Sequence, residues 1–176
     1  MTTHAIAQAM KQVEAVLMKE PERGLDDDAP ATARWQGGTR VTASHANGAQ
    51  MQTDMPAELG GSGDQVSPGW MFRAGLASCL TTCIAMNAAA QGIALDTLEV
   101  VARSRSDVRG LLGMAEADGQ PVNAASRDVQ LSVRVAAAGV SPERLRALVD
   151  ASYRRSPVPC ALAAATPIAL SVEVAG

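Results

Sequence analysis

The sequence predicts a mixed α+β fold, in which helical and strand-like segments follow one another without regular alternation. The clearest helix signal lies in segment 67–91, which holds a single charged residue between a start signal and a stop signal. Apolar residues alternate strictly in segments 129–135 and 168–174, a pattern typical of half-buried strands. The 176 residues suffice for one core, so we expect a single domain over 31–176, preceded by a helix and an acidic linker over 1–30.

The N-terminal segment predicts a helix that ends before Pro21. Its apolar residues recur at the spacing of one helical face: Ile6, Met10, Val13 and Leu17. The following segment, 20–30, contains three consecutive aspartates and predicts a solvated linker. This acidic run has no metal-ligand spacing, so we interpret it as a charged surface segment.

Strand-like segments follow the linker. We expect strands over 32–36 and 39–44, then a turn at Asn47-Gly48 and a third strand that ends near Asp54. The glycine-rich loop at 60–63 lacks the Gly-Lys-Ser/Thr ending of a phosphate-binding loop. It therefore gives little reason to expect a nucleotide site.

The central helix over 67–91 begins with Ser67 as N-cap and Pro68 in the first turn, and Gly92 is a natural stop. Arg73 is its only charged residue. A helix that is apolar nearly all round must be buried on most faces, in a large core or between subunits. This helix is therefore a first indication of a dimer.

The second half of the chain predicts two strands, a helix and a final strand. A strand over 97–106 and an irregular stretch over 107–127 precede the alternating strand at 129–135. A helix over 141–155, a short helical turn over 160–165 and a last strand at 168–174 complete the chain.

Composition excludes several classes of function. A formal net charge of −3 and only four aromatic residues argue against nucleic-acid binding. The most apolar segment, 74–90, contains four polar residues and is too short and too polar for a membrane span. No secretory signal is visible, and three cysteines do not form a disulfide framework. We expect a cytoplasmic protein with no membrane or nucleic-acid partner.

The cysteines are the remaining candidates for chemistry. Cys79 and Cys83 lie four residues apart on one helix face, where their Cβ atoms are about 5–6 Å apart. A disulfide needs about 3.5–4.5 Å, so these two should not bridge in an intact helix. All three cysteines, Cys160 included, could also be small buried apolar residues. No Cys-x-x-Cys pair supports a zinc site with His45, so we predict no metal and no cofactor.

An ordered set of motifs resembles the OsmC/Ohr family, which comprises osmotically inducible protein C and the organic hydroperoxide resistance proteins. The matching segments are Ser67-Pro68, Arg73 to Cys79, Gly92 to Val100, Thr53 to Pro56, Asp107 to Gly110, and Ser156-Pro157-Val158 ahead of Leu162. This resemblance implies an OsmC-like fold in an intertwined homodimer, with two sheets wrapped around long central helices. The N-terminal helix is similar to an extension found in some members.

The resemblance further implies a thiol peroxidase. Cys79 matches the peroxidatic cysteine, which attacks a hydroperoxide and becomes sulfenic acid; a second cysteine then forms a disulfide that an external dithiol reduces. An arginine near the partner's helix would stabilise the thiolate, and Arg40 is the first candidate, followed by Arg34.

Two departures from the family pattern bear on this function. The usual second cysteine is replaced by Ser156, and Cys160, four residues later, is the candidate resolving thiol. A glutamate that orients the arginine is replaced by Gly69, with Glu58 or Asp64 as candidate substitutes. Two functions remain open. One is thiol-dependent reduction of organic hydroperoxides in an oxidative-stress response. The alternative is a catalytically weak dimer that binds an apolar small molecule in a pocket between the subunits.

Overall fold

The computed structural model describes residues 2–174. In chain order the elements are α1 (Thr3–Leu17), η1 (Pro21–Gly24), β1 (Thr32–Trp35), β2 (Val41–Ser44), β3 (Gln50–Thr53), η2 (Ala57–Leu59), α2 (Pro68–Ala90), β4 (Thr97–Arg105), α3 (Val108–Leu111), β5 (Arg127–Ala136), α4 (Pro142–Tyr153) and α5 (Pro157–Ala163). Within these residues no helix is both long and apolar enough to span a membrane.

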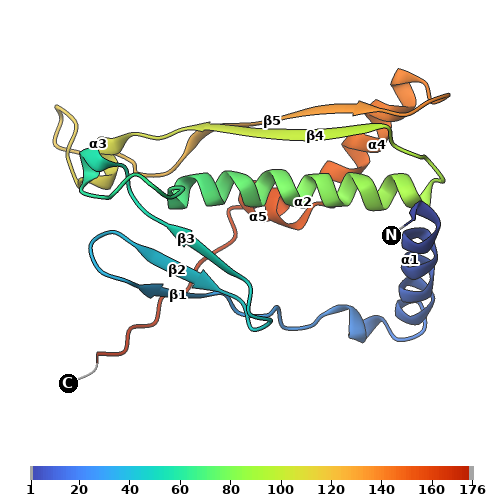
Figure 1. Ribbon diagram of the computed structural model, residues 1–176, viewed down its shortest axis with the longest axis horizontal. Helices are drawn as coiled ribbons and strands as arrows, with labels where there is room; N and C mark the ends of the chain where they lie inside the picture. The colour runs from blue at the N-terminus through green and yellow to red at the C-terminus, as the bar shows by residue number, and fades with distance from the viewer. Residues whose placement is uncertain (1, 175–176) are drawn as a thin grey trace.

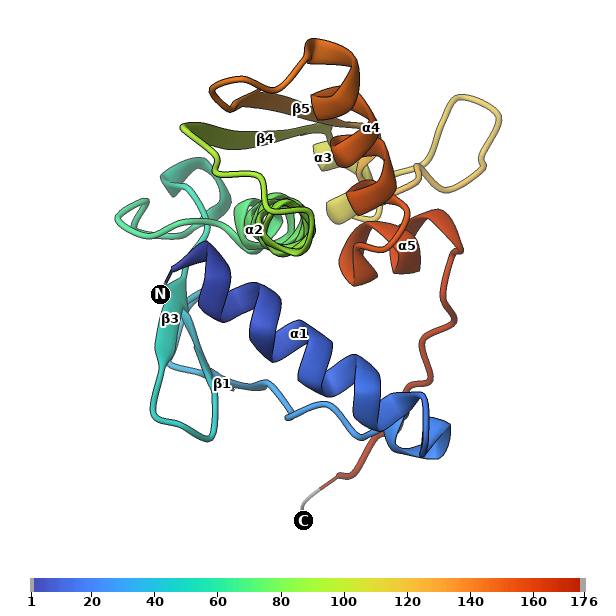
Figure 2. The same cartoon turned by 90° about the vertical axis from the view of Figure 1, so that its right-hand side faces the viewer.

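The strands form two separate antiparallel sheets. Strands β1, β2 and β3 pair in sequence order, and β4 pairs with β5. Figure 1 shows the long helix α2 between the two sheets, with the β4–β5 sheet on one side and the three-stranded sheet on the other. Figure 2 looks along α2 and shows α4 and α5 beside it, with α1 crossing near its end. The mixed α+β architecture predicted from the sequence is therefore confirmed.

Helix α2 begins as its sequence predicts. The Ser67 side chain accepts a hydrogen bond from the Trp70 backbone N–H, and Pro68 occupies the first turn. Beyond its C-terminal end, Gly92 has φ +67°, a conformation that glycine adopts without strain.

Only one stripe of α2 is fully buried within a single chain. Its members are spaced mostly one helical turn apart: Leu76, Leu80, Ile84, Ala88 and the adjacent Ala89. Leu80, Ile84 and Ala88 pack in one cluster with Leu145 and Leu148 of α4, against the inner face of the β4–β5 sheet. The expectation that α2 is buried on most faces is not met by one copy of the chain, because Trp70 and Met86 remain exposed.

Helix α5 begins earlier than expected. The sequence predicts a helical turn from 160, after a break caused by Pro157 and Pro159, whereas the helix starts at Pro157 itself. The first four N–H groups of a helix have no partner within it, so prolines in the first turn cost no hydrogen bond. The first helical bond runs from the Cys160 N–H to the Ser156 carbonyl at 2.9 Å.

The predicted last strand is absent, which corrects the sequence-based expectation. Segment 167–174 is extended but pairs with no strand in the part of the chain that the structure describes. Its alternating apolar side chains are almost fully exposed: Ile168 95%, Leu170 88%, Val172 73% and Val174 86%. A strand needs hydrogen bonds from a neighbouring edge, and this chain folds with no edge beside the segment.

Candidate thiol site

Cys79 lies in the middle of α2 and is half-buried. The hydroxyl of Ser156, at the start of α5, donates a hydrogen bond to the Cys79 sulfur at 3.2 Å. Ser156 is fully buried, so this contact is shielded from solvent on the serine side. Helix packing therefore joins two positions that lie 77 residues apart in the chain.

The local sequence explains why the Ser156 hydroxyl turns toward Cys79. Ser156 is the N-cap of α5, and an N-cap serine ordinarily accepts from the second or third helical N–H. The third helical residue is Pro159, which has no N–H, and the first is Pro157. Of the two usual capping donors only the Val158 N–H remains, and the Ser156 side chain makes no capping bond with it. The hydroxyl proton of Ser156 is directed to the Cys79 sulfur.

Cys83 lies one turn after Cys79 on α2. Its thiol points to the Arg155 carbonyl at 4.0 Å, directly beside Ser156. Burial raises the pKa of the Cys83 thiol, and hydrogen bonding from Ser156 opposes this effect. Cys83 also lines a cavity of about 470 Å³ between α1 and α2, so the N-terminal helix covers this side of the site.

Cys160 is exposed on the first part of α5. Its thiol faces the carbonyls of Arg154 and Tyr153, with sulfur–oxygen distances of 3.4 and 3.8 Å. The three cysteines therefore surround one turn, residues 153–156, but the side chain in contact with Cys79 is Ser156. The contacts of the Cys160 thiol are with these carbonyls and not with the Cys79 sulfur.

Arg40 follows the turn at 36–39 and precedes β2. Its guanidinium donates to Asp54 at 3.0 Å and to Ser62 at 2.6 Å, and it forms an ion pair with Asp64. Within residues 2–174, no hydrogen bond or ion pair joins Arg40 to Cys79 of the same chain. The prediction for Arg40 concerns the partner's helix and stays a prediction. Arg34, the second candidate, is exposed on β1.

Two acidic residues hold Arg40 in place. Asp64, one of the two substitutes considered for the missing glutamate, contacts it directly. Hydrogen bonds from Ser62 and Arg40 lower the pKa of Asp64. Asp54 is the residue that sequence reasoning missed, although it lies within one of the matching motifs.

Asp54 is buried and accepts five hydrogen bonds. The donors are the Thr39 hydroxyl at 2.5 Å, the Ser62 hydroxyl at 2.7 Å, the Met55 N–H at 2.8 Å, Arg40 at 3.0 Å and the Ser62 N–H at 3.2 Å. These bonds, led by those from Thr39 and Ser62, hold the pKa of the Asp54 carboxyl far below its usual range. The network ties the start of β2 to the loop that leads into α2.

Gly69 lies in the exposed first turn of α2, where the family pattern has a glutamate. A Cβ added to Gly69 would lie 3.8 Å from the Arg73 guanidinium, so the site has room for a side chain. The Arg73 guanidinium lies 3.4 Å from the Ser104 hydroxyl of β4. A metal centre is not evident, because no three histidine, cysteine or acidic side chains converge within the described residues.

The OsmC-like protein family matches residues 61–171, a segment that includes the whole of α2 and the turn at Ser156. The chain belongs to the OsmC-like protein family. This confirms the resemblance that the sequence motifs indicate. Among proteins with curated functions, none matches the sequence of this OsmC-like chain.

Solved structures confirm the fold of the OsmC-like chain. It is similar to an OsmC-like protein from Mycoplasma pneumoniae, with 18% identity, a TM-score of 0.65, and 79% of this chain and 89% of that chain covered. An organic hydroperoxide resistance protein OsmC from Legionella pneumophila gives 22% identity, a TM-score of 0.55, and coverage of 78% and 90%. An organic hydroperoxide resistance protein from Elizabethkingia anophelis gives 19% identity and a TM-score of 0.55, with 78% of this chain and 89% of that chain covered. At these identities the likeness establishes the fold alone.

Proposed function

We propose that this OsmC-like protein reduces organic hydroperoxides in the cytoplasm, with Cys79 as the peroxidatic thiol. The observation that carries the proposal is the half-buried Cys79 on the central helix, held by the Ser156 hydroxyl at 3.2 Å. Membership of the OsmC-like family supports it, and so do the two fold relatives named as organic hydroperoxide resistance proteins.

The proposed reaction begins with attack of the Cys79 thiolate on the outer oxygen of the hydroperoxide. The O–O bond breaks, the sulfur becomes sulfenic acid, and the alkoxide takes a proton from solvent and leaves as an alcohol. The buried Ser156 hydroxyl donates to the sulfur and would stabilise the negative charge that the thiolate carries. An oxidative-stress function follows from the removal of such peroxides.

Recovery of the thiol requires a second thiol. We propose Cys160 for this step: its thiol would condense with the Cys79 sulfenic acid, releasing water and forming a disulfide that an external dithiol then reduces. Cys160 lies one helical turn after Ser156. Its present contacts with the carbonyls of residues 153 and 154 mean that the turn must rearrange first.

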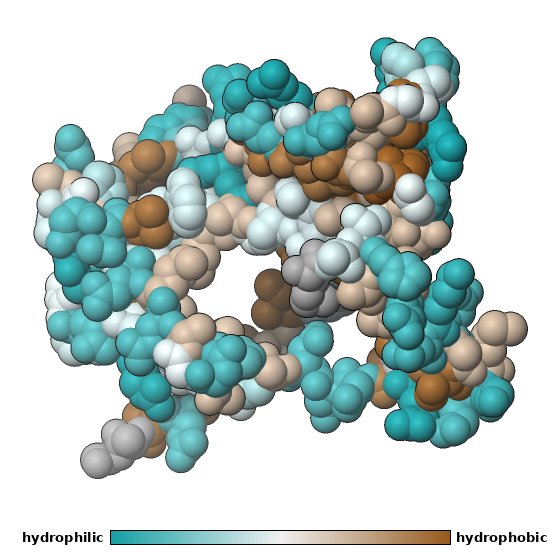
Figure 3. All heavy atoms as spheres, turned by 45° about the vertical axis from the view of Figure 1, so that its right-hand side comes forward, coloured by the Kyte–Doolittle hydropathy of each residue, from teal (hydrophilic) through white to brown (hydrophobic). Residues whose placement is uncertain are grey.

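The proposal includes a homodimer in which the site is completed by a second copy. The partly exposed faces of α2 and the unpaired segment 167–174 support it, since both expose apolar side chains in a single chain. Figure 3 shows an opening that passes through the single chain between the three-stranded sheet and the rest of the molecule. A partner's central helix would fill this opening, and Arg40 would then face the partner's Cys79.

The test is mass analysis of the reduced full chain after one equivalent of cumene hydroperoxide, with mapping of the oxidised cysteines. A disulfide between Cys79 and Cys160 supports the proposal in full. Sulfenic or over-oxidised Cys79 alone supports a peroxidase that depends on an outside thiol and removes Cys160 from the mechanism. Cys83→Ser is the matched control, because it removes the neighbouring thiol and should leave the oxidation of Cys79 intact.

An unmodified Cys79 would overturn the peroxidase. Ser156 at the position facing Cys79 favours the alternative in that event, because a hydroxyl cannot form a disulfide. The alternative is an OsmC-like dimer that binds an apolar small molecule between its subunits and retains a slow thiol. If cumene hydroperoxide oxidises the Cys79→Ser chain to the same extent as the unmodified chain, that result would also count against the peroxidase.

A further inference from the structure

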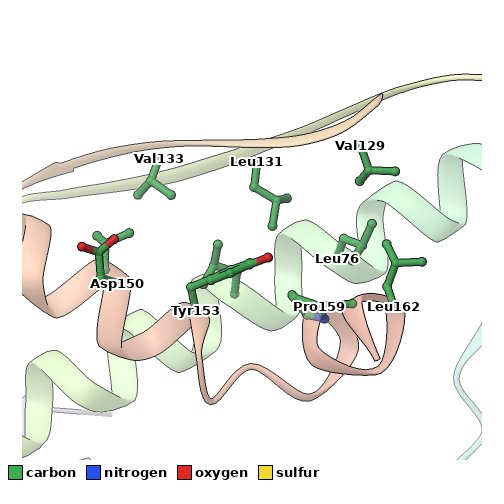
Figure 4. Close-up of a pocket in the computed structure, with 11 residues that line it drawn as sticks. Leu76, Val129, Leu131, Val133, Asp150, Tyr153, Pro159 and Leu162 are labelled. Atoms are coloured by element: carbon green, nitrogen blue, oxygen red, sulfur yellow. The ribbon is translucent and has the colours of Figure 1, made fainter. Parts of the chain in front are cut away.

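A slot of about 400 Å³ lies between β5 and the helices α4 and α5, next to the thiol site, and none of the three cysteines lines it. Figure 4 shows its two walls, with the side chains of β5 above and those of the helices below. The apolar residues that line it include Leu76, Leu80, Val129, Leu131, Val133 and Leu162. Cys79 does not line this slot, although its neighbours on α2 do.

The slot exists because α4 packs mainly on α2 rather than on β5. Leu145 and Leu148 direct α4 into the core beside α2. The apolar residues of β5 alternate toward the same side and are only half-buried. The inner face of β5 is therefore partly uncovered where the strand extends past the core beside α4. An apolar space of this size can hold a small ligand.

Two polar side chains of α4 border this apolar space. In Figure 4 the Asp150 carboxylate lies at one end, and the Tyr153 ring lies along the slot with its hydroxyl directed below Leu131. Within residues 2–174 neither side chain has a hydrogen-bond or ion-pair partner. A carboxylate accepts hydrogen bonds and a phenol both donates and accepts. Asp150 and Tyr153 are both exposed to solvent, and the Asp150 carboxylate can accept a hydrogen bond from a ligand head that donates.

Two arginines lie near this end of the slot but leave Asp150 free. Arg134 and Arg146 share a neighbouring cavity with Asp150. Arg146 forms an ion pair with Glu143 at 3.7 Å. Arg134 belongs to the residues of β5 that alternate with the inward-facing valines and is exposed. Asp150 is thus the only charged side chain that lines the apolar slot itself.

We propose that this slot binds an unbranched aliphatic molecule whose head group donates a hydrogen bond, an alcohol or a primary amine. The head would donate to Asp150 beside Tyr153, and the chain would lie against the leucines and valines of β5, α2 and α5. Each methylene removed from water strengthens binding about fourfold, so affinity should rise with chain length until the slot is full. The inference is independent of the proposed peroxidase.

The test is nuclear magnetic resonance of the full chain labelled at leucine and valine methyl groups, titrated with 1-octanol, octylammonium and octanoate. We expect 1-octanol and octylammonium to shift the methyl signals of Val129, Leu131, Val133 and Leu162 in a saturable manner. Octanoate should bind at least tenfold more weakly, because its carboxylate cannot donate and is repelled by Asp150. Hexanol should bind about 15-fold more weakly than octanol, since it lacks two methylenes.

Two variants separate the head-group site from general apolar binding. Asp150→Ala should weaken 1-octanol at least fivefold, whereas Glu99→Ala, an exposed carboxylate lost from β4, should leave its affinity unchanged. Ala163→Leu adds volume at the exposed end of the slot and should weaken both ligands. Equal or tighter binding of octanoate would overturn the proposal. Shifts of the same methyl signals with protein concentration alone would also overturn it, by assigning the slot to a second copy of the chain.

Discussion

The Ser156 hydroxyl lies 3.2 Å from the Cys79 sulfur, and it is buried while the sulfur is half-exposed. Pro159 removes one of the two N–H groups that could cap α5, and this N-cap serine makes no capping bond to its own helix. It places a hydroxyl where the family pattern has the second cysteine. Whether this chain forms a disulfide therefore depends on residues other than the one nearest to Cys79.

The first prediction restores a thiol at this position. In Ser156→Cys, the new sulfur should form a disulfide with Cys79 after one equivalent of cumene hydroperoxide, because the two side chains already touch. In a Cys160→Ser background, which removes the other proposed partner of Cys79, mass analysis should show the loss of two hydrogens per chain, reversed by dithiothreitol. Ser156→Ala is the matched control and should give no such bond. Sulfenic acid that persists in Ser156→Cys would contradict the close approach of these two side chains.

Local sequence signals predicted most of the fold. The serine–proline starts of α2 and α4 and the Asn47-Gly48 turn depend on short-range backbone chemistry, and each lies within a few residues of its expected place. The segment 167–174 could not be assigned in this way. The alternation of apolar residues in this segment indicates a tendency to form a strand. A strand forms only where the edge of another strand is free to pair with it, and the position of such an edge depends on distant parts of the fold or on another copy of the chain.

The candidate site was less predictable from the sequence. Cys79 and Cys160 were chosen as candidates because cysteines are few, and Arg40 was chosen because of a resemblance; their roles stay predictions. Asp54 gave no signal of its own, since a single aspartate at a strand end is ordinary. Its five hydrogen bonds arise only when Thr39, Arg40 and the loop at Ser62 meet in the folded chain.

The second prediction concerns Gly69 in the exposed first turn of α2. Gly69→Ala should raise the free energy of unfolding by about 0.5–1 kcal/mol, because alanine loses less backbone freedom on folding. Gly69→Glu should add about 0.3–0.5 kcal/mol more, from the Arg73 guanidinium one turn away and from the helix N-terminus. Urea unfolding measures both values. A glutamate variant less stable than the alanine variant would count against the pairing.

The third prediction is a pH dependence of stability that originates at Asp54. Its pKa is depressed in the folded chain, so its contribution to stability is complete above the unfolded value of about 3.9 and is lost as the pH falls further. Asp54→Asn should lower stability at pH 7 and flatten the decline below about pH 4. Urea unfolding at a series of pH values tests this. Glu58→Gln, in the same loop, should retain the full decline.

The fourth prediction concerns Gly110, in the motif Asp107 to Gly110. An added Cβ would lie 2.7 Å from the backbone of Ala124, closer than real contacts allow. Gly110→Ala should therefore force the loop apart and destabilise the chain by about 1–3 kcal/mol. Gly113→Ala is not a suitable control, because Gly113 has φ +69°. Gly75→Ala, with open space around it, should leave stability equal or higher.

The fifth prediction tests whether segment 167–174 forms a strand in a dimer. Leu170 is 88% exposed in a single chain, so Leu170→Lys should leave the stability of that chain nearly unchanged. If the segment pairs with a sheet of a second copy, the same change removes a buried leucine and should raise the dimer dissociation constant at least tenfold. Ser171→Lys places the same charge on the opposite face of the strand and should have little effect. Sedimentation velocity over a range of concentrations measures the dissociation constants. Equal dissociation constants for the two variants would contradict the strand pairing of segment 167–174. An unmodified chain that remains monomeric at about 50 μM, a concentration at which specific interfaces are ordinarily occupied, would contradict the dimer.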